Sequence, residues 1–265
     1  MIRQAHPQDR PGVVTTVTAA FAQDPGWAFI LGKEYERLVA DFVGATFDVR
    51  VGGKNVWVTD DLAAVAMWDP PEGGEDSAGG YAEGVWARYR AIAGEEAWDR
   101  LARYKEAVAA AYPAEPYWYL GVLATDPKRQ REGLATALLS PIIEEADRLE
   151  IPCCLETSTA ENRRFYERRG FTQATEIILR ADQPPGGYGS EGHDTHVSWR
   201  PKGQTRHAAG SQPARLPQAD RLTHAGAREQ PAKRARRTHK MWSQVHAEGS
   251  RQPLGWNARL GLRNF

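Results

Sequence analysis

The stretch LGVLATDPKRQREGLATALL, residues 120–139, places two different patterns side by side. Residues 118–125 are apolar nearly throughout, which is typical of a central strand covered on both faces. Asp126 and Pro127 end this run in a turn. Apolar residues then recur at helical spacing over residues 132–149. The stretch therefore predicts a buried strand, a tight turn and a long helix in succession.

The loop Gln130–Ala135, at the start of that helix, has the chemistry of an anion site. A helix N-terminus presents free N–H groups and the positive end of the helix dipole. Gly133 lets the backbone approach a bulky phosphate, and Ala135 keeps the helix shoulder small. The nearby cations are Lys128, Arg129 and Arg131. These features favour pyrophosphate binding, although spacing alone fits an ordinary strand–turn–helix with a basic loop equally well.

Patterns elsewhere in residues 1–201 complete an α/β (α+β) fold with a mixed sheet. Period-two and short apolar runs predict strands at residues 2–5, 55–59, 62–68, 118–125, 151–156, 171–180 and 195–199. Helical spacing predicts helices at residues 7–23, 35–49, 81–112 (with a break near Gly94), 132–149 and 159–169. Ser158 and Glu161 form a capping-box pattern before the last of these helices.

Two segments of this region resemble the GNAT acetyltransferases. The loop of that family reads Q/R-x-x-G-x-G/A, and Gln130, Gly133 and Ala135 occupy its pattern positions. The run LETSTAENRRFYERRGF, residues 155–171, is similar to the family's second half, a strand and then a helix with Asn and Tyr before GF. The likeness covers residues 1–201. It extends to the subgroup that includes puromycin N-acetyltransferase, through the segments at residues 21–25, 115–119 and 155–170.

The resemblance implies a mostly antiparallel sheet of about seven strands with flanking helices. Two central strands splay apart in this family, and acetyl-CoA, the co-substrate, lies in the gap. The backbone of Leu123, Ala124 and Thr125 is then expected to pair with the pantetheine arm as a strand would. The implied pyrophosphate cradle is the backbone of Gln130, Arg131, Glu132, Gly133, Leu134, Ala135 and Thr136.

The same resemblance assigns catalytic roles. Asn162 and Tyr166 stand four apart and share a helix face. Asn162 is expected to hold the pantetheine arm, and Tyr166 to donate a proton to the departing thiolate. Glu156, at the end of a central strand, is the first candidate for the general base. Glu115 and Asp24 are the alternatives.

Two positions in the loop depart from the subgroup, which has Gly and then a basic residue where this chain has Arg131 and Glu132. A Cβ at Arg131 restricts the loop, and the Glu132 carboxylate faces the expected pyrophosphate region. We therefore expect weaker acetyl-CoA binding than a Gly-x-Gly loop would give.

Cysteine and histidine usage favours neither a disulfide scaffold nor a metal site. Cys153 and Cys154 are adjacent, which suits a reducing compartment, and no activating residue is close enough in sequence to favour an acetyl-cysteine intermediate. His193 and His196 lack the additional Cys or carboxylate ligands that a zinc site needs. The first ten residues show no secretory signal, and no apolar run is long enough to span a membrane. A cytoplasmic protein is expected.

Charge divides the chain in two. Of 34 basic and 34 acidic residues, residues 202–265 hold 13 basic and 3 acidic, which leaves 21 basic and 31 acidic in residues 1–201. The acidic part favours a cationic substrate such as an amine, unless it is simply a solvated surface. Residues 202–265 lack apolar periodicity and are expected to be a disordered basic extension, with nucleic acid as a conceivable partner.

The sequence thus predicts an acyltransferase that moves an acetyl group from acetyl-CoA to a primary amine of a small molecule, by direct attack in a ternary complex. It is expected to be a monomer or a homodimer. The alternatives are a non-catalytic acyl-CoA-binding or regulatory module and a protein N-acetyltransferase.

Overall fold

The computed structural model describes residues 1–71, 79–109, 111–180 and 192–202. Its strands are β1 (Ile2–Gln4), β2 (Val56–Thr59), β3 (Ala64–Asp69), β4 (Trp118–Thr125), β5 (Cys153–Thr157), β6 (Thr172–Arg180) and β7 (Gly192–Arg200). Its helices are α1 (Arg10–Phe21), α2 (Pro25–Leu31), α3 (Tyr35–Val51), α4 (Gly79–Ala93), α5 (Glu95–Ala109), α6 (Leu134–Arg148) and α7 (Ala160–Glu167), with short 3-10 turns at Pro7–Asp9, Gly32–Glu34 and Pro127–Arg129.

The strands form one seven-stranded sheet in the order β1-β2-β3-β4-β5-β7-β6. Every neighbouring pair is antiparallel except β4 and β5, which are parallel and are connected through α6. This confirms the mixed, mostly antiparallel sheet. The described helices do not combine the length and apolar character that crossing a bilayer requires.

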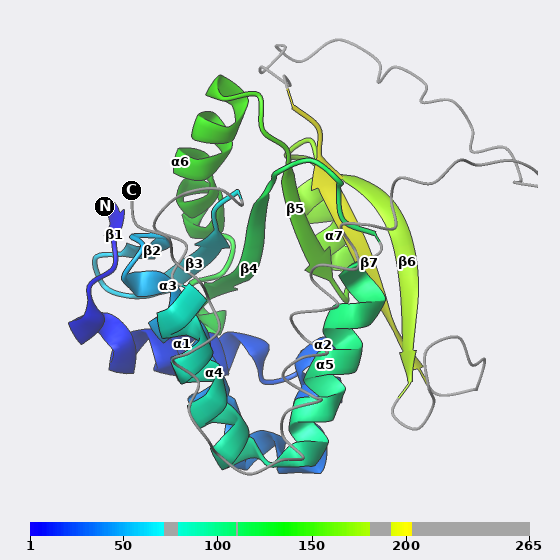
Figure 1. Cartoon of the computed structure of the whole chain (residues 1–265). Helices are drawn as coiled ribbons and strands as arrows, with labels where there is room; N and C mark the ends of the chain where they lie inside the picture. The colour runs from blue at the N-terminus through cyan, green and yellow to red at the C-terminus, as the bar shows by residue number, and fades with distance from the viewer. Residues whose placement is uncertain (72–78, 110, 181–191, 203–265) are drawn as a thin grey trace, which may run out of the picture. The chain divides into compact units, whose positions relative to one another are not determined.

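The centre of the sheet opens where β4 and β5 separate. Their pairing runs only from Trp118 opposite Cys153 to Leu120 opposite Leu155, although both strands continue beyond it. In Figure 1 the two strands lie together at the top and diverge downward. The expected splay of the central strands is therefore present.

A β-bulge lies at the same place. Met67 of β3 is opposite Val122 and Trp68 is opposite Leu120, so Gly121 is the extra residue on β4. Bulges bend a strand and increase its twist, which accounts for β4 leaving β5 just after Leu120. A Cβ at Gly121 would stand 2.9 Å from Nη2 of Arg50, so a side chain here would require the Arg50 guanidinium to move.

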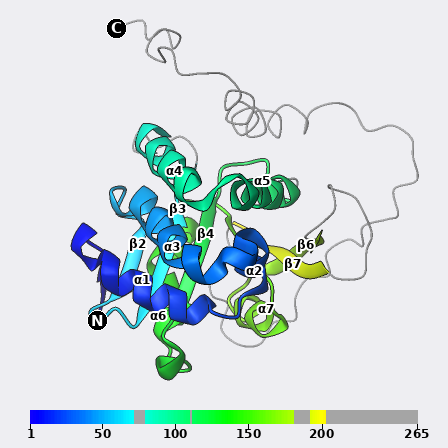
Figure 2. The ribbon, with the colours of Figure 1, turned by 90° about the horizontal axis from the view of Figure 1, so that it is seen from below.

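Helices cover both faces of the sheet. Ala64, Ala66 and Trp68 of β3 belong to a core cluster with α6, and the alternating Val65 and Met67 are buried on the other face. The helices that contact β3 there are α1 and α3. Next to them, α4 packs on α3 and α5 packs on α2, as both views show (Figures 1 and 2). Helices α2, α3, α4 and α5 surround the open end of the β4–β5 gap.

Two local expectations are corrected. The sequence patterns predicted no helix over residues 25–31, but these residues form a further helix, α2, because the Asp24 side chain accepts a hydrogen bond from the Trp27 N–H (2.9 Å) and caps a new N-terminus. The helix α7 is capped by Thr159, whose hydroxyl accepts from the Asn162 N–H, rather than by Ser158.

Candidate active site

A cavity that opens to solvent lies where β4 and β5 diverge. Its sheet side is formed by residues 119–123 of β4 together with the end of β5. Helices α1, α2, α3, α4, α5 and α7 supply most of the remaining walls. The cavity therefore brings together segments from most of the described chain.

One edge of β4 is available along this cavity. Beyond Leu120 the edge that faces β5 has no strand partner among the described residues, while the other edge stays paired with β3 through Thr125. Unpaired backbone groups need a partner, so this edge is suited to an extended ligand that pairs like a strand. Leu123 lines the cavity, and Ala124 directs its side chain into the protein. The backbone roles of Leu123, Ala124 and Thr125 remain predictions.

The loop at residues 130–136 leads into the N-terminus of α6, where backbone N–H groups are free to bind an anion. Ala137 N–H donates to the Gly133 carbonyl (3.0 Å), so the earlier N–H groups, up to Thr136, have no acceptor inside α6. Gly133 is left-handed with φ 84°, which suits a residue without Cβ. Arg131 has φ 68°, an unusual conformation for a side-chain-bearing residue. The cradle formed by residues 130–136 is consistent with this backbone and is otherwise untested.

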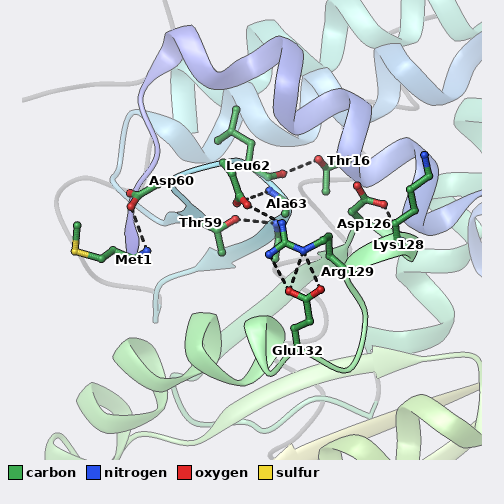
Figure 3. A network of polar contacts seen from close by, with 12 residues as sticks. Met1, Thr16, Thr59, Asp60, Leu62, Ala63, Asp126, Lys128, Arg129 and Glu132 are labelled. Atoms are coloured by element: carbon green, nitrogen blue, oxygen red, sulfur yellow. Dashed lines mark hydrogen bonds and ion pairs between the residues drawn. The ribbon is translucent and has the colours of Figure 1, made fainter.

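The loop's charges are arranged differently from the sequence expectation. Figure 3 shows the Arg129 guanidinium on the Glu132 carboxylate, with Nε 2.8–2.9 Å from its two oxygens. A second contact of Arg129, 2.9 Å long, goes to Asp61. Arg129 accordingly lowers the pKa of Glu132. The Glu132 carboxylate is thus neutralised by a loop cation, and among the described residues Lys128 and Arg131 have no ion-pair partner.

Helix α7 brings the two residues named from its sequence to the cavity. Asn162 and Tyr166 both line it, Asn162 exposed and Tyr166 8% exposed. The Tyr166 ring packs edge-on against Phe165 and Phe171, which fixes its orientation. Burial raises the pKa of Tyr166, so its hydroxyl is protonated at neutral pH. It can therefore act as a proton donor.

Glu156 lies at the end of β5, in the wall of the same cavity. Its Oε2 accepts a 2.6 Å hydrogen bond from the Tyr119 hydroxyl. Its Oε1 is shielded from solvent and has no hydrogen-bond partner among the described residues. Burial raises the pKa of Glu156 to about 7, against an opposing effect of the Lys105 charge. A carboxylate with this pKa and a free oxygen is suited to accept a proton near neutrality.

Sequence reasoning missed Tyr119, which donates to Glu156, and Lys105, which contacts Tyr119. Tyr119 is on β4, and Lys105 of α5 places Nζ 3.4 Å from the Tyr119 hydroxyl and 4.9 Å from its ring centroid. Burial opposes the Lys105 charge, but Tyr119 and Glu156 outweigh it and raise the pKa of Lys105. A signal existed: Lys105 follows Leu101 and Tyr104 on the buried face of α5, where a lysine is unusual.

The other candidate bases are placed less favourably. Asp24 lines the cavity, and burial raises its pKa, but its carboxylate is engaged as the cap of α2. Glu115 is paired with Lys202 (2.6 Å) and is not among the residues that line the cavity. The geometry therefore favours Glu156.

Cysteine and histidine play no visible part in this site. Cys153 and Cys154 are unpaired and buried, and burial raises the pKa of each thiol to about 12. Thiols held protonated in this way are poor nucleophiles. His196 is buried in β7, and the His193 side chain lies outside the described residues. Within the described chain, no three metal-ligating side chains gather into a group.

Comparison with known proteins matches part of the chain to acetyltransferases. A model of the acetyltransferase (GNAT) domain matches residues 89–173, which include every residue predicted for the site except the alternative base Asp24. An uncharacterized N-acetyltransferase of Schizosaccharomyces pombe is 35% identical over 65 residues, a match that spans 24% of this chain and only 26% of that relative.

Solved structures share the fold. Arylalkylamine N-acetyltransferase 2 of Aedes aegypti superposes with a TM-score of 0.52 at 15% identity, covering 76% of this chain and 98% of that one. A structure from Corynebacterium glutamicum described as histone acetyltransferase HPA2 and related acetyltransferase has a TM-score of 0.50 at 21% identity, covering 76% of this chain and 96% of that one. The splayed sheet and these structures agree on a GNAT-type fold for the described residues, and residues 89–173 match the acetyltransferase (GNAT) domain model.

Proposed function

We propose that this protein transfers the acetyl group of acetyl-CoA to a primary amine of a small molecule, by direct attack in a ternary complex. The observation that carries the proposal is the free Oε1 of Glu156, in one cavity with Tyr166 and the unpaired edge of β4. Proton acceptor, proton donor and a binding edge for an extended thioester are thus within one site.

Each of these groups has one task in the proposed reaction. Glu156 takes a proton from the bound ammonium, and the free amine attacks the thioester carbonyl carbon. The C–N bond forms and the C–S bond breaks, and the departing thiolate receives a proton from Tyr166. Asn162 and the backbone of Leu123, Ala124 and Thr125 orient the pantetheine arm, and the loop at residues 130–136 binds the pyrophosphate.

Release of free CoA thiol from acetyl-CoA, measured with a panel of amines, tests the proposal. Because Tyr166 acts only after attack has begun, Tyr166→Phe should lower kcat by about 100-fold or more and leave the Kd for acetyl-CoA unchanged. An unchanged kcat would remove Tyr166 from the mechanism. Tight acetyl-CoA binding without thiol release for any amine would instead identify a non-catalytic acyl-CoA-binding module.

Finer features of the proposal rest on sequence. The resemblance to the puromycin N-acetyltransferase subgroup and the acidic charge of residues 1–201 support a small-molecule amine over a protein N-terminus. The proposed catalytic domain is residues 1–201, followed by a basic extension at residues 202–265. A reduced state of Cys153 and Cys154 agrees with a cytoplasmic location. A monomer or homodimer without a metal would suffice for this chemistry.

A further inference from the structure

Four aromatic side chains, each from a different helix, form a continuous wall of the cavity: Phe21, Trp27, Phe42 and Trp86. Phe21 stacks on Trp27 with ring centroids 4.1 Å apart. Trp27 meets Phe42 edge-on at 5.1 Å, and Phe42 meets Trp86 at 6.3 Å. We refer to these four residues as the aromatic wall.

Core packing accounts for only half of the aromatic wall. Trp27 and Phe42 are 9% and 6% exposed and belong to the buried interior. Phe21 and Trp86, at the two ends, are half-buried and keep ring surface open to the cavity. Apolar surface that a ligand removes from water contributes about 25 cal/mol per Å² to binding. The open ring surface is therefore a place where a flat apolar group would bind.

The charges around the cavity favour an ammonium group at Glu156 and not at the aromatic wall. The cations there are already engaged, Arg50 with Asp69 (2.7 Å) and Lys105 with the Tyr119 ring. The free carboxylate oxygen belongs to Glu156. A ligand complementary to both features carries an amine at one end and a flat apolar body at the other.

Other amine classes fit this arrangement less well. A polyamine or an aminated sugar would bring several charges or hydroxyls against the aromatic wall, where they lose water without gaining partners. A polypeptide would bring backbone N–H and C=O groups to the same surface at the same cost. An aromatic ring loses little on leaving water and gains ring–ring contacts.

We infer that the acceptor is a primary amine that carries an aromatic ring, and that the aromatic wall binds this ring while the amine reaches Glu156. This inference rests on the proposed function for the reaction, but the ring-binding site itself can be measured without turnover.

The experiment compares 2-phenylethylamine with n-hexylamine and ethylamine in the wild-type protein and in Trp86→Leu. The leucine keeps apolar bulk and removes the ring. We expect kcat/KM for 2-phenylethylamine to exceed that for n-hexylamine, and to fall about tenfold in Trp86→Leu through KM. The value for ethylamine, which carries no ring, should not change. Trp86→Phe should restore most of the loss.

Phe29→Leu is the matched control. Phe29 is on α2 near Trp27, but its ring faces the Arg103 guanidinium (5.9 Å) and does not line the cavity. This variant should leave the preference for 2-phenylethylamine intact. Equal effects of Phe29→Leu and Trp86→Leu would show a general loss of packing and overturn the inference.

Calorimetric titration with 2-phenylethylamine and ethylamine separates the two proposals. Binding of 2-phenylethylamine that depends on Trp86, without acetyl transfer, would support the ring site and contradict the proposed reaction. Acetyl transfer with no preference for aromatic amines and no effect of Trp86→Leu would leave the reaction standing and overturn the ring site. A higher kcat/KM for a peptide α-amine than for 2-phenylethylamine would also overturn it.

Discussion

At the scale of single residues, the surroundings of Glu156 decide what it can do. A glutamate at the end of a strand is usually solvated and ionised at neutral pH. Here the Tyr119 hydroxyl holds one oxygen at 2.6 Å, while the other oxygen stays free inside the cavity. Burial raises the pKa to about 7. One carboxylate is thus both fixed in place and able to change its protonation near neutrality.

This arrangement predicts a pH profile. The deprotonated form of Glu156 is the base, so kcat/KM should rise with pH through about 7 and then level off. Glu156→Gln keeps the shape and the bond from Tyr119 but cannot take a proton. We expect it to lower kcat by about 100-fold or more and to abolish this ionisation in the profile. A variant with the wild-type profile would assign the base elsewhere, with Asp24 the next residue to test.

The stability of the same variant serves as its control. A carboxyl whose folded-state pKa lies above its unfolded-state value favours the protonated form when folded. Its stabilising contribution is present below the unfolded-state pKa and is lost as pH rises through about 7. The amide has no such ionisation, so Glu156→Gln should melt no lower than wild type at pH 8. A large drop in Tm would attribute the lost activity to misfolding.

The sequence predicted some of these residues and missed others for a physical reason. Glu156 lies at the end of a predicted strand and Tyr166 lies on a predicted helix, and both line the cavity. Lys105, Tyr119 and Trp86 come from segments whose meeting depends on how helices pack around the sheet. Periodicity locates a residue on a face of its own element, and it does not say which distant element that face meets.

At the scale of elements, the loop before α6 shows how one backbone angle affects a binding site. Arg131 occupies the left-handed region, where a residue with a Cβ carries about 1 kcal/mol of strain. The sequence identified this position as atypical, and the structure gives the reason. The two predicted strands and the helix around the loop lie almost where periodicity placed them, because their apolar residues follow a regular spacing.

Arg131→Gly should relieve this strain. We expect tighter acetyl-CoA binding than in wild type, measured by calorimetric titration, provided that the loop has to hold this angle around the ligand. Arg131→Ala is the matched control, because it removes the charge and keeps the strain. The difference between the two variants isolates the backbone effect, and equal Kd values for Gly and Ala would refute it.

Helix α2 is the element that the sequence did not reveal. Seven residues hold less than two full apolar repeats, and Asp24, Pro25 and Gly26 read as a turn. In the structure the same Asp24 ends the turn by capping α2, and the helix then contributes Trp27 to the cavity. A short helix with a turn-like start is thus invisible to periodicity, although it forms part of the site.

At the scale of the whole molecule, the described residues up to Lys202 already supply the full sheet and all the site residues named above. Lys202 itself is joined to Glu115, and Arg200 is joined to Asp147 of α6, so the end of β7 is fixed to the body. The division at residue 201 remains a prediction, since residues 203–265 lie outside the described chain.

Truncation after Lys202 tests that division. If residues 203–265 are an independent extension, the shortened protein should keep the Tm and the kcat/KM of the full chain, because the fixing contacts remain. A loss of either would show that the extension is integral. A salt-dependent DNA mobility shift that disappears on truncation would instead indicate a nucleic-acid role for the basic segment.

The extra residue at Gly121 has a consequence for how relatives are compared. Before it, Trp118 and Leu120 pack in or against the core cluster beneath α6; after it, Leu123 packs there, so the side of β4 that faces α6 changes from even to odd numbers. In a relative without this extra residue, the positions of β4 after the bulge would have their side chains on the opposite face of the sheet. A sequence alignment of such a pair without a gap at the bulge would equate residues that have opposite environments. Equivalent positions on β4 must therefore be counted from the bulge in both directions.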